Sequence, residues 1–209
     1  MLPFPDRAAA GAELAEVLSA LELERPVVCA IPRGGILVAV PIAEALDGEL
    51  DVVVVRKVGA PRNPELGLGA VGSVGPPVLD EHLIATLDVP RQFVEQEVAA
   101  QRDEARRRVA AYRGNSAPIA VAGRDAVVVD DGIATGGTVV AAAALLRAQG
   151  PRRLVLAVPV APVEGLARVR ASFDDTFCLS TPEPYTAVGQ WYVDFHQVSD
   201  DEVRSALAS

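Results

Sequence analysis

The chain has 209 residues, of which 50% are hydrophobic, and its formal net charge is -9 with a sequence pI of about 4.7. This length suits one domain that buries a core of its own. The acidic balance argues against nonspecific binding to nucleic acid or to an anionic membrane, because both require clustered Lys and Arg.

The start of the chain and its cysteines point to the cytoplasm. Residues 1–6 contain two prolines and no cationic stretch, so no secretory signal is expected. No uninterrupted apolar run reaches the roughly 18 residues of a membrane span. Cys29 and Cys178 lie in apolar runs, where a buried thiol is expected rather than a metal site or a disulfide. We expect a cytoplasmic protein that contacts neither a membrane nor nucleic acid.

Helical and strand patterns alternate along most of the chain. In order, the patterns predict a helix at 7–21 capped by Asp6, a strand at 27–31, a helix at 35–46, a strand at 52–55, a strand at 126–129, a helix at 138–149, a strand at 154–160, a helix at 163–172 and a strand at 176–179. The strands are continuous apolar runs, which is typical of strands buried on both faces. This alternation predicts an α/β fold with a doubly wound, mostly parallel sheet.

Two regions interrupt the alternation. Residues 59–75 are rich in glycine and proline and predict a mobile loop. Residues 89–113 predict a long polar helix with Pro90 in its first turn. The literal G-x-G-x-x-G match at 67–72 does not follow a strand, so its context excludes a dinucleotide-binding turn.

The stretch VVVDDGIATGGTVV, residues 127–140, carries the clearest chemistry. Asp130 and Asp131 end a buried strand, and ligands of parallel sheets bind at the carboxyl ends of strands. A glycine-rich approach to a helix N-terminus offers free backbone N–H groups to a phosphate. The carboxylates would repel that phosphate and only accept hydrogen bonds, so vicinal sugar hydroxyls are their natural partners. The stretch predicts a sugar-phosphate ligand.

This stretch resembles the phosphoribosyl-pyrophosphate (PRPP) motif of type I phosphoribosyltransferases. The resemblance implies that Asp130 and Asp131 bind the ribose hydroxyls and act in catalysis. It also implies a 5'-phosphate loop, formed by Ile133, Ala134, Thr135, Gly136, Gly137 and Thr138. The simple alternative for the two acids, a turn that caps a helix, leaves the glycine pair at the helix entry unexplained.

Two earlier segments also resemble parts of this family, so the resemblance covers roughly residues 26–160. IPRGG resembles the family's pyrophosphate loop, with Arg33, Gly34 and Gly35 on the phosphates and a cis peptide expected between Pro32 and Arg33. VVVVRKVGAP resembles the strand that enters the flexible catalytic loop, which would bring Arg56 or Lys57 to the pyrophosphate and give Lys57 a catalytic role. For Arg33 and Lys57, an ordinary surface charge at a strand end stays open as the alternative.

The resemblance implies Mg²⁺-dependent transfer of phosphoribose from PRPP to a nitrogenous base or similar acceptor, with release of pyrophosphate. Mg²⁺ would be held by PRPP, with Asp130 and Asp131 as further ligands, and residues 59–75 would close as a lid. A homodimer would suit the family. We expect a core at 1–180 with a helical insertion at about 80–113, followed by a small C-terminal hood at 181–209.

The C-terminal segment has two interpretations. Its aromatic residues would either close the sheet edge as a packing cluster or form a hood that binds the acceptor base; they are Tyr185, Trp191, Tyr192 and Phe195. No sequence signature identifies the acceptor. Two rival functions share the same pocket: a non-catalytic protein that binds PRPP or a nucleotide to control a partner, and a sugar-phosphate hydrolase.

Overall fold

The computed structural model describes residues 2–114 and 116–208, and it has a five-stranded parallel sheet at its centre. The strands lie in the order β2 (Glu49–Val52), β1 (Val27–Ala30), β6 (Asp125–Val129), β7 (Arg153–Val160) and β8 (Asp175–Ser180). Every neighbouring pair is parallel. The predicted α/β fold is therefore confirmed.

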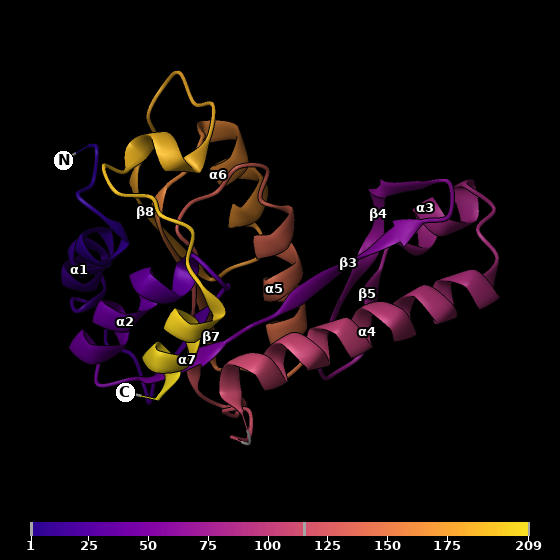
Figure 1. The fold of residues 1–209 in the computed structure, drawn as a ribbon, viewed down its shortest axis with the longest axis horizontal. Coiled ribbons are helices and arrows are strands. Elements are labelled where there is room, and N and C mark those ends of the chain that lie inside the picture. The colour runs from indigo at the N-terminus through magenta and orange to yellow at the C-terminus, as the bar shows by residue number, and fades with distance from the viewer. Residues whose placement is uncertain (1, 115, 209) are drawn as a thin grey trace.

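Helices cover both faces of this sheet (Figure 1). One face packs against α1 (Arg7–Leu18), α2 (Gly35–Ala45) and α7 (Asp200–Leu207), and the other against α5 (Gly137–Arg147) and α6 (Val163–Arg170). The alternation of side chains along a strand explains this division. On β6, Val127 and Val129 belong to the first core, whereas Ala126 and Val128 belong to the second.

The helices begin close to the predicted residues. Asp6 caps α1, since its carboxylate accepts a hydrogen bond from the Ala9 amide at 2.8 Å. Gly136 precedes α5 with a φ of +83°, a conformation that favours glycine. No helix among residues 2–114 and 116–208 is long and apolar enough to cross a membrane.

A second unit, which we call the arm, projects away from the central sheet (Figure 1). It comprises an antiparallel sheet of β3 (Val55–Ala60), β4 (Asn63–Gly72) and β5 (Val78–Leu79), together with α3 (Glu81–Thr86) and α4 (Arg91–Arg113). An apolar cluster that includes Val58, Leu68 and Val94 joins the sheet to its helices. The long polar helix predicted at 89–113 is thus confirmed, with a short helix before it.

Two predictions about this region are wrong. The predicted strand at 52–55 is split, because β2 ends at Val52 and the chain leaves the central sheet before β3 begins. β2 was missed because it is an edge strand whose first two residues are not buried. The predicted loop at 59–75 is mostly a hairpin. Its glycines permit close backbone contact, since a Cβ on Gly69 would lie 2.2 Å from the Val78 carbonyl oxygen.

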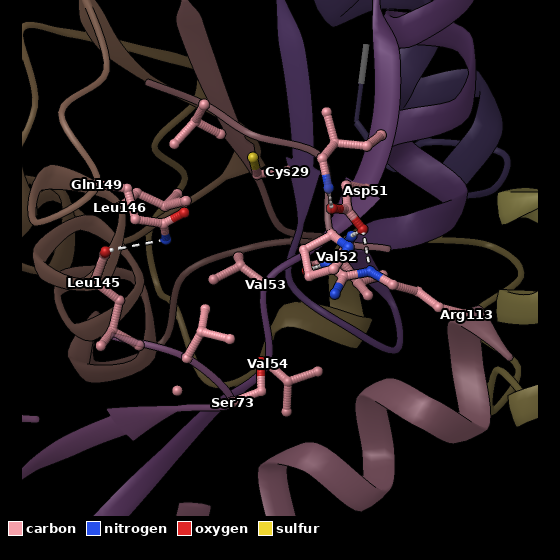
Figure 2. Close-up of a pocket in the computed structure, with 15 residues that line it drawn as sticks. Cys29, Asp51, Val52, Val53, Val54, Ser73, Arg113, Leu145, Leu146 and Gln149 are labelled. Carbon is pink, nitrogen blue, oxygen red and sulfur yellow. Dashed lines mark hydrogen bonds and ion pairs between the residues drawn. The ribbon is translucent and has the colours of Figure 1, made fainter. Parts of the chain in front are cut away.

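The arm is anchored to the central sheet by contacts between the end of β2, where the chain enters the arm, and the end of α4, where it leaves the arm (Figure 2). Buried Asp51 accepts hydrogen bonds from Arg113 Nε at 2.6 Å and from the Ile119 amide at 2.9 Å. Arg113 also donates to the Val52 carbonyl at 3.0 Å. Cys29, Asp51 and Arg113 line one small cavity of about 50 Å³, and burial raises the pKa of the Cys29 thiol to about 12. The prediction of a free, buried thiol is confirmed for Cys29.

Candidate functional site

The two acids follow β6 directly and meet a tightly packed loop. Ile133 is buried and its amide donates to the Val160 carbonyl at 2.9 Å, which ties the loop to β7. A Cβ on Gly132 would lie 2.6 Å from Val188 Cγ1, and one on Gly136 would lie 2.6 Å from Val169 Cγ1. Packing therefore requires both glycines, and at Gly136 the positive φ requires glycine as well.

Asp130 and the predicted phosphate loop line one hollow of about 170 Å³. The other lining residues are Gly132, Ile133, Ala134, Thr135, Gly136, Gly137, Thr138, Val139 and Val188. The first turn of α5 opens onto this loop, and its N–H groups have no partner within the helix. An anion in the hollow would meet these groups and the positive end of the helix dipole.

The IPRGG segment packs against the same acids. Its Pro32–Arg33 peptide bond is cis, as predicted. A Cβ on Gly35 would lie 2.7 Å from the Val129 carbonyl oxygen, and one on Gly34 would lie 1.9 Å from Asp131 Oδ2. A Cβ at Gly34 would displace the Asp131 carboxylate and one at Gly35 would clash with backbone, so the segment lies directly beside the two acids. The Arg33 guanidinium lies 3.7 Å from Asp200 on α7.

The two carboxyl groups have different surroundings. The Asp131 amide donates to Asp130 Oδ1 at 2.9 Å, and Arg7 Nε donates to Asp131 Oδ2 at 2.8 Å. Burial raises the pKa of Asp130 well above its ordinary value, and repulsion by Asp131 raises it further. Burial also raises the pKa of Asp131, while the Arg7 guanidinium acts in the opposite direction. The site therefore favours an ionised Asp131 over an ionised Asp130.

Arg56 and Lys57 point in different directions from β3. Lys57 lines a cavity of about 740 Å³ between the arm and α5, together with Thr135 and Thr138 of the loop. Arg56 Nε instead donates to Gln101 of α4 at 3.0 Å. Successive residues of a strand face opposite sides, which explains the division. The structure brings Lys57 to the loop and Arg56 to the helix behind it.

The C-terminal aromatics lie beside the acids and pack closely with the N-terminal segment. Tyr192 is buried, and its hydroxyl donates to the Asp131 carbonyl oxygen at 2.6 Å. Phe195 stacks on Tyr192 with ring centroids 5.2 Å apart. Tyr185 and Trp191 form a second pair at 6.0 Å, near the 3-10 helix η1 (Val188–Trp191). For Tyr192 the geometry matches the packing interpretation, and contact with an acceptor base stays a prediction for all four.

Comparison with known proteins decides the family. A sequence model of the phosphoribosyl transferase domain matches residues 3–196. The chain belongs to this family.

Three relatives illustrate the match. A Mycobacterium tuberculosis protein, provisionally named as a phosphoribosyl transferase, is 43% identical over 204 residues, which are 98% of this chain and 46% of that protein. The chain thus spans about half of that relative's length. A Clostridioides difficile uracil phosphoribosyltransferase is 48% identical over 52 residues, a quarter of each chain. The crystal structure of TT1426 from Thermus thermophilus has a TM-score of 0.90 and 48% identity, covering 99% of this chain and 98% of TT1426.

Arg7 is the residue of this phosphoribosyl transferase domain that sequence reasoning missed. It is the first residue of α1, lies 124 positions from Asp131 and is only 6% exposed. A signal was available, because a cation at a helix N-terminus opposes the helix dipole. An arginine at that position suggests a partner of opposite charge elsewhere in the fold.

The carboxylates also define how this domain could hold a metal ion. Among residues 2–114 and 116–208, no group of three or more His, Cys, Asp or Glu side chains is arranged to hold one. The protein would contribute Asp130 and Asp131 at most, and a ligand and water would complete the coordination. Mg²⁺ fits this donor set, because it takes oxygen ligands and commonly keeps several waters.

Proposed function

We propose that the protein is a phosphoribosyltransferase that uses PRPP and Mg²⁺ to transfer phosphoribose to a nitrogenous acceptor, releasing pyrophosphate. The observation that carries this proposal is the convergence of three groups at the carboxyl end of the sheet. Asp130 lines the same hollow as the loop at the start of α5, and Gly34 and Gly35 press against the two acids from the other side. This arrangement suits a ligand with phosphates on both sides of a diol.

Each part of PRPP has a proposed binding group. Asp130 and Asp131 accept hydrogen bonds from the ribose hydroxyls. The 5'-phosphate binds the loop formed by Ile133, Ala134, Thr135, Gly136, Gly137 and Thr138. The pyrophosphate binds Arg33 and the backbone of Gly34 and Gly35, with Lys57 approaching from the arm. Arg56 is left out of this role because its guanidinium is engaged by Gln101.

The residues would lower the barrier mainly through electrostatics. As the bond from the anomeric carbon to pyrophosphate breaks, negative charge grows on the leaving group and positive charge on the ribose. Arg33 and Lys57 stabilise the former, while the Asp130 and Asp131 carboxylates stabilise the latter. Bound Mg²⁺ would neutralise part of the pyrophosphate charge, with the two acids as its protein ligands.

Calorimetry with PRPP and Mg²⁺ tests the ligand. Wild-type protein should bind PRPP, and the double variant Asp130→Asn/Asp131→Asn should bind it far more weakly. Equal binding by both proteins, or no binding by the wild type, would overturn the ligand assignment.

A screen of nitrogenous bases for pyrophosphate release tests the reaction. Release that depends on one base supports transfer and identifies the acceptor. PRPP binding without release across the panel would favour the alternative, a non-catalytic PRPP- or nucleotide-binding regulatory protein. Formation of ribose phosphate without any added base would indicate hydrolysis.

A further inference from the structure

We infer that Arg7 is a positioning residue of the sugar site, which fixes the Asp131 carboxylate and is itself held by the C-terminal segment. The inference rests on the proposed function, since it gives Arg7 its role through the carboxylate that would bind the ribose. Arg7 belongs to α1, so it adds an element that none of the three sequence motifs contains.

One oxygen atom of Asp131, Oδ2, is held from two sides. Arg7 Nε lies 2.8 Å from Asp131 Oδ2, and the Gly34 Cα is so close that a Cβ there would lie 1.9 Å from the same oxygen. Oδ2 is therefore enclosed by Arg7 and the pyrophosphate loop. A ribose hydroxyl would approach the other oxygen, Oδ1, whose direction is set when Oδ2 is held.

Arg7 is itself held by two residues of the C-terminal segment. Its Nη1 donates to the His196 carbonyl oxygen at 3.0 Å, and its guanidinium carbon lies 3.8 Å from the centroid of the Phe195 ring. A guanidinium can donate in two directions while its flat face stacks on an aromatic ring, which an ammonium group cannot reproduce. The contacts with Phe195 and His196 thus orient Arg7, and Arg7 orients Asp131.

Burial of the Arg7 guanidinium has a desolvation cost. Arg7, Asp51 and Asp125 are the buried charged or polar residues among those the structure describes. Asp51 accepts hydrogen bonds from Arg113 and the Ile119 amide, and Asp125 accepts them from Arg152 and the Glu24 amide; neither residue lines the site's hollow. A buried guanidinium loses its hydration, so it persists where its partners compensate. The third buried charge is placed against a candidate ligand-binding carboxylate.

Calorimetry with PRPP and Mg²⁺ on Arg7 variants tests this inference. Arg7→Met keeps the apolar stem as far as the place of Nε but removes the guanidinium, and it should weaken PRPP binding about tenfold to a hundredfold, the range for losing one charge-assisted hydrogen bond. Arg7→Lys should recover only part of the loss. Arg153→Met is the matched control, because Arg153 pairs with Asp175 at 2.7 Å outside the site, and it should bind PRPP like wild type.

A double-mutant cycle separates positioning from a general loss of stability. Phe195 is 37% exposed, so Phe195→Leu should fold, and it should weaken PRPP binding through the orientation of Arg7. In the Arg7→Met background the same substitution should add no further loss. Independent, additive losses would show that Phe195 acts without Arg7 and would overturn the inference.

The outcomes also separate this inference from the proposed function. If wild type binds PRPP but Arg7→Met binds it equally or more tightly, the positioning role is overturned and the function stands. If wild type does not bind PRPP, the proposed function fails and the role of Arg7 fails with it. NMR can check the contact without ligand: the Arg7 Nε–H should exchange slowly with solvent in wild type and rapidly in Asp131→Ala.

Discussion

Gly34→Ala is expected to damage the sugar site through a single added methyl group. The new Cβ would lie 1.9 Å from Asp131 Oδ2 and 3.1 Å from Arg7 Nε. Ordinary contact with a Cβ begins at 3.4 Å, so the carboxylate would have to move by about 1.5 Å. Asp131 cannot rotate away freely, because Arg7 holds the same oxygen at 2.8 Å.

The size of the effect follows from this displacement. A misplacement of about 1 Å in an active site can cost on the order of 100-fold, which corresponds to about 2.7 kcal/mol. PRPP affinity should fall by that factor. Forcing a methyl group into a packed position should also cost about 1–3 kcal/mol of folding stability, so thermal unfolding must show that the variant is folded at the assay temperature.

Titration calorimetry with PRPP and Mg²⁺ measures the loss. Gly48→Ala is the matched control, because its Cβ would lie 3.1 Å from the Pro26 carbonyl oxygen, a contact that a shift of a few tenths of an ångström relieves. This control should bind PRPP within about twofold of wild type. If Gly34→Ala is folded and binds PRPP like the control, Asp131 is not a ligand of the sugar and the reasoning is refuted.

Three further predictions concern stability. Burial raises the pKa of Asp130, so ionising this carboxyl group at neutral pH lowers the stability of the folded protein. Asp130→Asn should therefore raise Tm at pH 7 in the absence of ligand, by about 2–4 °C for each kcal/mol relieved. Calorimetric scans should show this gain shrinking as the pH falls. Hydrogen bonds with Glu202 and Asp194 raise the pKa of His196 above 6.5. Their contribution to folding stability is therefore complete below pH 6.5 and is lost as the pH rises through the raised pKa. His196→Gln should flatten this part of the curve of stability against pH, and an unchanged curve would contradict the assignment. Arg113→Met leaves the buried Asp51 carboxylate without its cation, so it should lower the free energy of unfolding by about 3–5 kcal/mol, measured by urea denaturation. A loss below about 1 kcal/mol would show that the contact between Arg113 and Asp51 contributes little to stability.

The parts of the fold and site that are encoded locally could be predicted from the sequence. The apolar run before Asp130 and the glycines after it carry a strand, a turn and a helix start within 14 residues, and the structure has all three. The edge strand β2 escaped prediction because its exposed start lacks the apolar signal of a central strand. The hairpin at Asn63 to Gly72 escaped because glycines that permit close strand contact resemble glycines of a loop.

The place of Arg7 at a helix N-terminus suggests an acidic partner, but no local pattern identifies that partner as Asp131. Their contact joins residues 124 positions apart, and neither segment shows a period or spacing that refers to the other. The same holds for Tyr192, whose hydroxyl reaches the Asp131 carbonyl across 61 positions. The sequence motifs indicated the side of the site that we propose faces the ligand, while the support behind the carboxylates depends on how the two ends of the chain meet.

The ordered hairpin of the arm changes the entropy balance of ligand binding. A flexible catalytic loop that becomes ordered on a ligand loses about 1–2 kcal/mol of backbone freedom per residue. Here Lys57 lies on a paired strand that packs against α4, so most of that freedom is already lost in the folded protein. An approach of Lys57 toward the pyrophosphate would then be a rotation of the whole arm about its two connections. Affinity would depend on the stiffness of those few linking residues rather than on the length of a loop.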